Sequence, residues 1–309
     1  MTEREQRALQ DLLPQAIDQC EVDWDRVAGV RYVVRQRFRY EYPRPVTDLR
    51  HRLIVVPPDR HGDQRTVLGH VAVSGAAAES RWSRDRWGNV RVAVAAPAVG
   101  SWVEFEAGIV VERAAPARPC PLPSSSSSDA SLLGPTPLTE PVPALVDAAR
   151  HLRERAGGGL ALAEAVCEWT HGALRYQGGV TDVGTSAGRA LELGAGVCQD
   201  YAHVMLVLCR LLGLPARYVS GHVMGEGGTH AWVEVVLPDP AGSGAVAVPF
   251  DPTYGCRPGL DHVTVATGRD YRDVAPTAGT YTGEPGGRLS ASKRMDVVGV
   301  EYARGRRTA

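Results

Sequence analysis

Three residues in the second half of the chain could together form a nucleophilic site. Cys198 follows the segment Gly194-Ala-Gly-Val and stands at the first turn of a strongly apolar helical segment. Unpaired backbone N–H groups and the positive end of the helix dipole favour a thiolate at such a position. The residue type and its placement therefore predict that Cys198 is a nucleophile.

A cysteine nucleophile needs a base, and that base needs a hydrogen-bond acceptor that orients it. His230 begins one predicted strand after a glycine-rich loop, and Asp251 ends the next predicted strand just before Pro252. Adjacent antiparallel strands place the start of one and the end of the other at the same edge of a sheet. We therefore expect His230 and Asp251 to meet there and to serve Cys198 if its helix packs on that sheet.

The other five cysteines are not predicted to be nucleophiles. A buried cysteine is usually a small hydrophobic residue, and Cys167 and Cys209 lie on apolar helix faces that fit this interpretation. Cys20, Cys120 and Cys256 lack the start of a helix that would favour a thiolate and are set aside.

Two of the polar residues also have purely structural interpretations. His203 lies inside the helix of Cys198. It could be a packed core residue or a hydrogen-bond donor that supports the catalytic residues, and the core interpretation is favoured. Asp251 precedes a proline and could be a turn residue only.

Cysteine and histidine could instead bind zinc. Cys198, His203, His222 and His230 are candidates, but no pair among them has the C-x₂₋₄-C or H-x₃₋₅-H spacing of zinc sites. The glycine-rich stretches match neither a dinucleotide-binding motif nor a P-loop. The sequence predicts no metal and no cofactor.

The order of predicted elements indicates an α+β protein. Strands with period-two alternation run from Val30 to Glu112 and predict an all-β sandwich. Residues 114–143 hold eight of the 22 prolines and are predicted to be a linker or wrapping segment without a helix or central strand. Helical spacing follows at 144–156, 160–173 and 198–212, and then strands at 216–223, 230–237 and 245–250.

These patterns divide the chain into five parts. They are a helical extension at 1–28, a β domain at 29–115, a Pro/Ser-rich linker at 116–143, a catalytic core at 144–300 and a tail at 301–309.

Composition excludes several classes of function. The 309 residues carry a formal net charge of -1, so there is no global electrostatic reason to bind nucleic acid or an anionic membrane. No window of 18 apolar residues could form a transmembrane helix, and the first residues lack the apolar stretch of a signal peptide. We expect a cytoplasmic protein with free thiols rather than disulfides.

Four sequence blocks resemble the bacterial transglutaminase-like proteins. They are GAGVCQDYAHVMLVLCRLLGLPARYVSGHV from Gly194, GGTHAWVEVVLP from Gly227, PFDPTYG from Pro249 and GRDYRDVAPTAGTYTG from Gly268. The strands beginning YVVRQRFRYEYPRPV at Tyr32 are similar to the β domain that precedes the core in this family. The resemblance implies a papain-like α+β core after a sandwich-like β domain.

The resemblance also implies a catalytic triad and a reaction. Cys198 corresponds to the nucleophile, His230 to the general base and acid, and Asp251 to the residue that orients the imidazole. The implied reaction is acyl transfer from an amide through a thioester, to water or to an amine, without a cofactor. The backbone N–H of Cys198 should be one oxyanion donor, and Tyr176 or Gln177 is the candidate for the second.

We expect a cysteine-dependent amide hydrolase or acyltransferase that acts on peptide or isopeptide-like amides of a protein or peptide substrate. We prefer hydrolysis to amine cross-linking, because water resolves the thioester unless the site excludes water and holds an amine. The alternative is a catalytically idle binding or scaffold protein that keeps the fold. Trp232 could shield the site from water or be an ordinary core residue. Tyr254 stands where many relatives of this family have asparagine.

Overall fold

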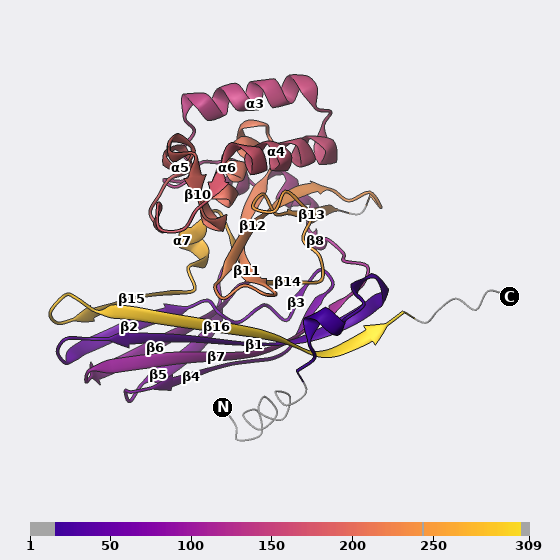
Figure 1. Ribbon diagram of the computed structural model, residues 1–309. Helices are drawn as coiled ribbons and strands as arrows, with labels where there is room; N and C mark the ends of the chain where they lie inside the picture. Colours follow the sequence, from indigo (N-terminus) through magenta and orange to yellow (C-terminus); the bar gives the residue numbers. More distant parts are fainter. Residues whose placement is uncertain (1–15, 243, 304–309) are drawn as a thin grey trace.

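The computed structural model describes residues 16–242 and 244–303, and they form two lobes (Figure 1). The lower lobe consists mainly of long strands, whereas the upper lobe combines helices with a second set of strands. This arrangement confirms the expected α+β core preceded by a β domain.

The β domain is a sandwich of two antiparallel sheets, with strand orders β16-β1-β7-β4-β3 and β15-β2-β6-β5. Side chains such as Phe38, Leu49, Val94 and Phe105 alternate with outward residues and form one cluster between the sheets. The strands are β1 (Val27–Glu41), β2 (Val46–Leu53), β3 (Arg60–His61), β4 (Gln64–Ser74), β5 (Glu79–Arg84), β6 (Val90–Val99), β7 (Trp102–Ala114), β15 (Thr277–Thr282) and β16 (Arg288–Tyr302).

The core domain has one five-stranded sheet of order β14-β11-β12-β13-β8. Its strands are β8 (Cys120–Leu122), β11 (Ala216–Val223), β12 (His230–Pro238), β13 (Ala245–Phe250) and β14 (His262–Gly268). The helices are α2 (Ala130–Leu133), α3 (Pro143–Arg155), α4 (Gly159–Ala173), α5 (Ala187–Leu193), α6 (Cys198–Leu211) and α7 (Tyr271–Val274). A short parallel pair, β9 (Arg175–Tyr176) and β10 (Ala195–Gly196), precedes α6.

Helix α6 is the centre of the core domain. Every residue from Gln199 to Arg210 is buried, because α3, α4 and α5 pack on it from one side and β12 from the other. This surrounding explains why its sequence is apolar on almost all faces. The expected central position of this helix is confirmed.

The predicted domain boundary at 300 is wrong. Residues 144–300 were expected to form the catalytic core, but β15 pairs with β2 and β16 pairs with β1 along nearly its whole length. These strands therefore belong to the β domain, where β16 covers the edge of β1. The polar first half of β16, RLSASKRMD, lacks the apolar alternation that would have revealed a strand.

Two smaller predictions also need correction. In the described part of residues 1–28, two 3₁₀ turns, η2 (Gln19–Glu21) and η3 (Trp24–Arg26), replace the expected helix, and residues 1–15 lie outside the described residues. The expected linker at 116–143 contributes edge strand β8 to the core sheet and contains the 3₁₀ helix η4 (Ser124–Ser128) and α2. Helix α2 forms there because Asp129 caps it by accepting the Ser131 N–H at 2.8 Å.

Side chains of the β domain complete the hydrogen bonding of β14, the free edge of the core sheet. Gln64 exchanges two hydrogen bonds with the backbone of Thr264, at 2.7 and 2.8 Å, and Asn89 does the same with Thr267 at 2.7 and 2.8 Å. Both amides are buried, so they take the place of a neighbouring strand. The two domains are therefore joined by specific polar contacts.

A buried ion pair strengthens this junction. Arg113 on β7 binds both oxygens of Asp63, at 2.6 and 3.0 Å, and donates to the carbonyls of Gly259 and His262. The two charged side chains are only 10% and 4% exposed. The β domain thereby fixes the segment that leads into β14.

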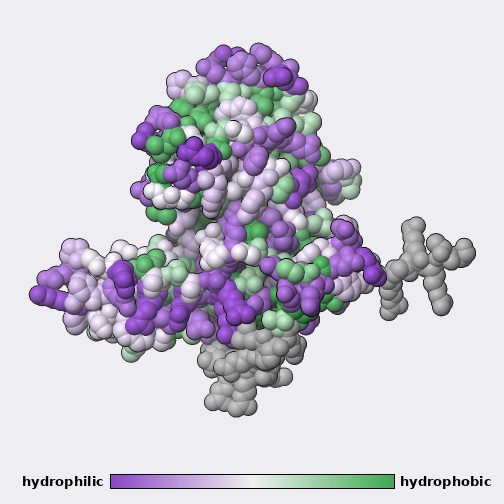
Figure 2. Space-filling view, viewed as in Figure 1, coloured by the Kyte–Doolittle hydropathy of each residue, from purple (hydrophilic) through white to green (hydrophobic). Residues whose placement is uncertain are grey.

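The visible face of the β domain is largely hydrophilic, whereas apolar residues show mainly on the upper lobe (Figure 2). Within residues 16–242 and 244–303, no helix is both long and apolar enough to cross a membrane.

We expect Arg113→Ala to lower the free energy of unfolding by about 3–5 kcal/mol, because Asp63 would stay buried without its partner. Urea denaturation measures this change. Arg31→Ala is the matched control: Arg31 pairs with Glu112 at 2.6 Å but is 46% exposed, and its loss should cost less than about 1 kcal/mol. Equal effects of the two substitutions would contradict a structural role for the buried pair.

Candidate active site

Cys198 is the first residue of α6 and is partly exposed. The turn before it is closed by Asp200, whose Oδ2 accepts hydrogen bonds from the Val197 N–H at 2.8 Å and the Thr181 hydroxyl at 2.7 Å. A Cβ atom at Gly196 would lie 2.5 Å from the same oxygen, so the chain needs glycine there. The thiol therefore sits at a fixed, capped helix N-terminus, as the sequence predicts.

His230 and Asp251 meet at one edge of the core sheet. His230 begins β12, Asp251 follows the end of β13, and these strands are antiparallel neighbours. His230 Nε2 lies 2.7 Å from Asp251 Oδ2, and both side chains are buried. Cys198 lies close enough to His230 to help raise the pKa of its imidazole, so the structure brings the three predicted residues together.

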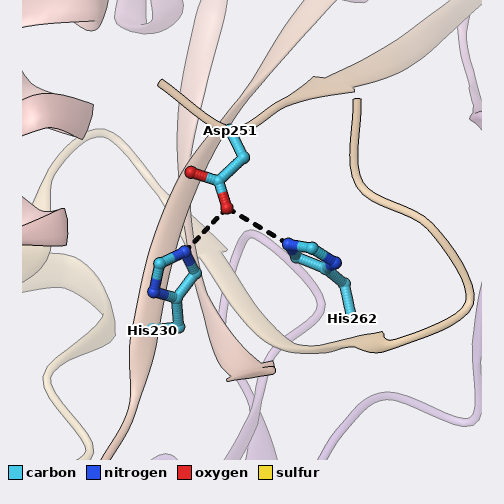
Figure 3. A group of neighbouring side chains, drawn as sticks. All are labelled: His230, Asp251 and His262. Carbon is cyan, nitrogen blue, oxygen red and sulfur yellow. Dashed lines mark hydrogen bonds and ion pairs between the residues drawn. The ribbon is translucent and has the colours of Figure 1, made fainter. Parts of the chain in front are cut away.

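A second histidine, which the sequence analysis did not identify, shares the same carboxylate oxygen. His262 at the start of β14 places its Nε2 3.1 Å from Asp251 Oδ2 (Figure 3). Its Nδ1 lies 2.9 Å from Asp261 Oδ1. The polar pair Asp261-His262 directly before an apolar β segment was the available signal. This signal identifies His262 as a site residue only when the pairing of β14 with β11 is known.

Asp251 accepts four hydrogen bonds. Besides the two rings at Oδ2, its Oδ1 accepts the backbone N–H groups of Thr253 at 2.9 Å and Tyr254 at 3.3 Å. A buried carboxylate in this setting is fully satisfied without another ligand. The turn after β13, closed by a backbone bridge between Asp251 and Cys256, supplies these donors.

His230, Asp251 and His262 also form the only group among the described residues whose ligand atoms, all within 4.8 Å of one another, could hold a metal ion. The two nitrogens point at one carboxylate oxygen at hydrogen-bond distances of 2.7 and 3.1 Å. A cation would require both rings to give up these N–H donors. The arrangement fits hydrogen bonding better than metal binding.

The pKa values of this cluster are mutually shifted. Burial lowers the pKa of His230, but hydrogen bonds to Asp251, Cys198 and Glu226 outweigh it and raise the pKa well above its ordinary value. Burial also lowers the pKa of His262, which Asp251 and Asp261 raise overall. Burial raises the pKa of Asp251, yet the two imidazoles hold it far below its usual range. The site therefore favours an ionised carboxylate beside protonated imidazoles.

Glu226 occupies the other side of the His230 ring. Its Oε2 lies 3.2 Å from Nδ1, and its Oε1 accepts a short hydrogen bond from the Tyr254 hydroxyl. The Tyr254 ring stacks on His230 with centroids 5.3 Å apart. Lys293 of β16 binds the carbonyl of Val223 at 3.2 Å, so the β domain also supports the loop that carries Glu226. Sequence reasoning missed Glu226 because glycines surround it in a loop.

Tyr176 and Gln177 lie beside the nucleophile through the β9–β10 pair, in which Tyr176 is the partner of Gly196. The backbone N–H of Gln177 donates to Gly196 at 2.9 Å, and its side-chain oxygen accepts from Arg175 at 2.8 Å. Tyr176 is 59% exposed, and the charges of Cys198, Glu226 and His230 reach it. The Tyr176 hydroxyl and the side-chain NH₂ group of Gln177 both remain available as donors.

Trp232 and His203 support the site from within. Trp232 is buried, with its ring centroid 6.1 Å from that of His230 and 5.3 Å from that of His262. A Cβ atom at Gly221 would come within 2.3 Å of the Trp232 ring, so this tight fit needs glycine. His203 is fully buried, packs on Tyr218 and accepts the N–H of Tyr271 at 3.3 Å, which matches the core interpretation.

The Asp251 cluster predicts a pH-dependent stability. Asp251 has a lowered pKa, so its contribution is present above its ordinary pKa of 3.8 and is lost as pH falls. His230 and His262 have raised pKa values, so their contribution is present below 6.5 and is lost as pH rises. Between pH 3.8 and pH 6.5, the free energy of unfolding of wild type should exceed that of Asp251→Asn by about 3–5 kcal/mol. Outside this range the difference should be smaller.

Urea denaturation from pH 3 to pH 9 measures this difference. Asp48→Asn is the control, because Asp48 pairs with Arg50 at the surface, where the side chains are 63% and 72% exposed. Its curve should run parallel to that of wild type. A constant difference between wild type and Asp251→Asn over the whole range would refute the proposed charge state.

Comparison with known proteins shows what this chain is similar to. The model of the transglutaminase-like superfamily matches residues 147–252, and that of the bacterial transglutaminase-like N-terminal region matches residues 32–112. An uncharacterized protein of Mycobacterium leprae is 37% identical over 150 residues, which are 45% of this chain and about half, 49%, of that relative. An uncharacterized protein of Mycobacterium tuberculosis is 28% identical over 314 residues, which cover 88% of this chain and 93% of the relative.

The crystal structure of a proposed cysteine protease from Cytophaga hutchinsonii superposes with a TM-score of 0.71. It covers 89% of this chain and 93% of that protein at 19% identity, which shows a common fold. The chain therefore belongs to the transglutaminase-like superfamily, with a bacterial transglutaminase-like N-terminal region before its core.

Proposed function

We propose that this protein is a cysteine-dependent amide hydrolase or acyltransferase that acts on peptide or isopeptide-like amides. The observation that carries the proposal is the line from Cys198, at the N-terminus of α6, to the neighbouring His230, whose ring is hydrogen-bonded to buried Asp251. Such a line can activate a thiol and return its proton to a leaving group. The proposed partner is a protein or peptide substrate.

In the proposed reaction, the Cys198 sulfur attacks the amide carbonyl carbon while His230 Nδ1 holds the thiol proton. Asp251 Oδ2 accepts the Nε2–H of the same ring and so stabilises the imidazolium. The C–N bond then breaks, His230 protonates the departing amine, and a thioester remains on Cys198. Water or a second amine, deprotonated by His230, attacks this thioester and restores the thiol.

His262 acts in this scheme as a positioning residue. Its N–H donates to the same Asp251 oxygen, and Asp261 holds its second nitrogen at 2.9 Å. Because Asp251 is fixed from four directions, it cannot rotate away when the charge on His230 changes. The imidazole is thereby kept in the orientation that leaves Nδ1 toward Cys198.

Developing charge on the substrate oxygen requires hydrogen-bond donors. The backbone N–H of Cys198 at the start of α6 is the first proposed donor. The hydroxyl of Tyr176 is the second, since the exposed ring lies close enough for the charge of Cys198 to act on it. The backbone N–H of Gln177 is already used by Gly196, which leaves only its side-chain NH₂ as the other candidate.

Hydrolysis is preferred to amine transfer because the rim of the site is open. Tyr176, Val183 and Tyr254 are 59%, 59% and 48% exposed. Val183 follows Asp182, whose carbonyl accepts from Gln199 in the first turn of α6 at 3.4 Å. Water can therefore reach the thioester, and the apolar rim favours substrates with an apolar side chain near the scissile amide.

The cytoplasmic location stays a prediction.

Glu226 defines the difference between an active and an idle site. Its carboxylate lies 3.2 Å from Nδ1 of His230, the nitrogen that the proposed reaction uses, so it must move or share this nitrogen when substrate binds. The loop can permit this, because Gly225, with φ +84°, and Gly227 flank Glu226. A permanently closed loop would correspond to the scaffold alternative.

We expect Cys198→Ala to abolish covalent labelling by a peptide with an electrophilic carbonyl, since the acyl-enzyme forms on this sulfur. Intact-protein mass spectrometry detects the adduct. Cys20→Ala is the control, because Cys20 is an exposed thiol far from the site in sequence, and its labelling should equal that of wild type. Undiminished labelling of Cys198→Ala, or none in wild type, would overturn the proposal, and the second result would favour the scaffold.

Tyr176→Phe should slow acylation by an amide substrate by about 10²-fold if its hydroxyl binds the oxyanion. Alkylation of Cys198 by iodoacetamide forms no oxyanion and should keep its rate. Single-turnover kinetics with both reagents separate the two effects. Equal slowing of both reactions would mean that Tyr176 only shapes the site.

The acyl acceptor can be identified by incubating the protein with a peptide library and a labelled primary amine. Mass changes distinguish the outcomes, because hydrolysis adds water across an amide whereas transfer attaches the amine. We expect cleavage products to dominate. Predominant incorporation of the amine would assign the site to cross-linking instead.

A further inference from the structure

A second cluster of thiol, imidazole and carboxylate lies at the junction of the two domains, apart from Cys198. Its residues are Cys120 on β8, His61 on β3, and Glu234 on β12, joined by Arg217 on β11. His61 Nε2 lies 2.6 Å from Glu234 Oε1, and Arg217 Nε donates to Glu234 Oε2 at 2.7 Å. The cluster thus contains the same three chemical groups as the proposed active site, plus a guanidinium.

Cys120 lies beside both cationic groups of this cluster. It lines one cavity with His61 and Glu234 and another with His61 and Arg217, and both cations act on its titration. Its Sγ donates to the carbonyl of Pro121 at 3.8 Å. The Nη2 atom of Arg217 is buried and has no well-aligned acceptor, although Glu234 lies 2.7 Å away. A thiolate at Cys120 would give Arg217 a second negative partner beside Glu234.

A thiolate at Cys120 balances the charges of the cluster when His61 is protonated. His61 and Arg217 would carry two positive charges, against the single negative charge of Glu234. All three side chains are at most 12% exposed, so water screens the surplus poorly. Among the nearby carboxylates, Asp59 and Asp63 are already paired with Arg84 and Arg113.

The titration of the thiol follows the same pattern. Burial raises the pKa of Cys120, but the hydrogen bond and charge of His61, assisted by Arg217, lower it overall. The pKa of His61 is reduced by burial and raised by Glu234 and Cys120 to about 9. Cysteine reactivity depends on such a cationic, partly exposed setting.

Small molecules can approach this thiol. Two cavities, of about 230 and 340 Å³, are both lined by His61 and Cys120. Cys120 is half-buried. The cavities are large enough for a small reagent, but they do not offer the extended open surface that a folded protein would need.

We propose that Cys120 is a second reactive thiol of this protein, a site that small hydroperoxides oxidise to a sulfenic acid. The Cys120 thiolate attacks one oxygen of hydrogen peroxide, so that an S–O bond forms and the O–O bond breaks. The sulfur is oxidised and the peroxide is reduced. The departing hydroxide takes a proton from the His61 imidazolium and leaves as water, and the sulfenic acid remains beside neutral His61.

The site differs from a metal site in its charge. In the part of the chain that the structure describes, Cys120, His61 and Glu234 do not form a group close enough to share a metal ion. Arg217 adds a fixed positive charge, which repels a cation and attracts an anion. Oxidation of a thiolate fits this environment, whereas cation binding does not.

The test uses the full chain with Cys198→Ala, so that the proposed nucleophile cannot compete. The protein is treated with hydrogen peroxide at pH 7 in the presence of dimedone, and each cysteine is quantified by peptide mass spectrometry. Cys20 and Cys256, which are exposed, are internal references in the same digest. We expect the Cys120 adduct to form at least about tenfold faster than either reference.

Two further variants, made in the same background, assign the cause. His61→Gln removes the imidazolium and should slow adduct formation at Cys120 by about tenfold. Arg84→Gln is the matched control, because it removes a cation that lines the same cavity but is 46% exposed, and the rate should not change. Melting followed by circular dichroism verifies that each variant is folded.

The proposal is overturned if Cys120 reacts no faster than Cys20 and Cys256, or if a folded His61→Gln variant reacts as fast as its parent. If His61→Gln does not fold, the comparison of the three cysteines in the parent still decides. Because the parent lacks Cys198, the result is independent of the proposed amide chemistry.

Discussion

The structure of the site depends on one buried carboxylate. Asp251 has no exposed surface, yet it stays ionised because four N–H groups, two from imidazoles and two from its own turn, bind its oxygens. A buried charge is costly unless it is paired and fully hydrogen-bonded. The antiparallel β12 and β13 deliver His230 and Asp251, β14 delivers His262, and the turn after β13 supplies the remaining donors. Each of these elements must be in place before the charge is compensated.

The β domain is part of this requirement, because it fixes the third strand. Gln64 and Asn89 bind the outer edge of β14, and Arg113 holds the carbonyl of His262 itself. A core domain cut out at its sequence boundaries would leave this edge unpaired and the carbonyls of Gly259 and His262 without Arg113. The chain leaves the core after α7 and adds β15 and β16 to the sandwich. In sequence, the core therefore lies between two parts of the β domain.

The local parts of the site could be predicted from sequence, and the long-range parts could not. Cys198 was identifiable because a helix start, two glycines and an apolar run stand next to one another in the chain. His230 and Asp251 followed from strand order alone. His262 and Cys120 could not be found this way, because their partners come from elements far apart in sequence, such as His61 for Cys120. The strand β16 was missed for a related reason, since its pairing with β1 depends on the geometry of the whole sandwich rather than on its own pattern.

The alternation along β12 explains why both thiol clusters exist in one protein. Ala231, Val233 and Val235 face the helices in the main apolar core. The intervening His230, Trp232 and Glu234 therefore point to the opposite face, toward the β domain. A sheet that is buried on both sides normally carries apolar residues on both faces. Here the second face carries ionisable groups instead, and the β domain must supply their partners. One strand thus connects the two clusters, and the Trp232 ring lies between them. Only this packed side chain separates Glu234 from the His230 ring, so a change of charge at Glu234 occurs close to the proposed active site.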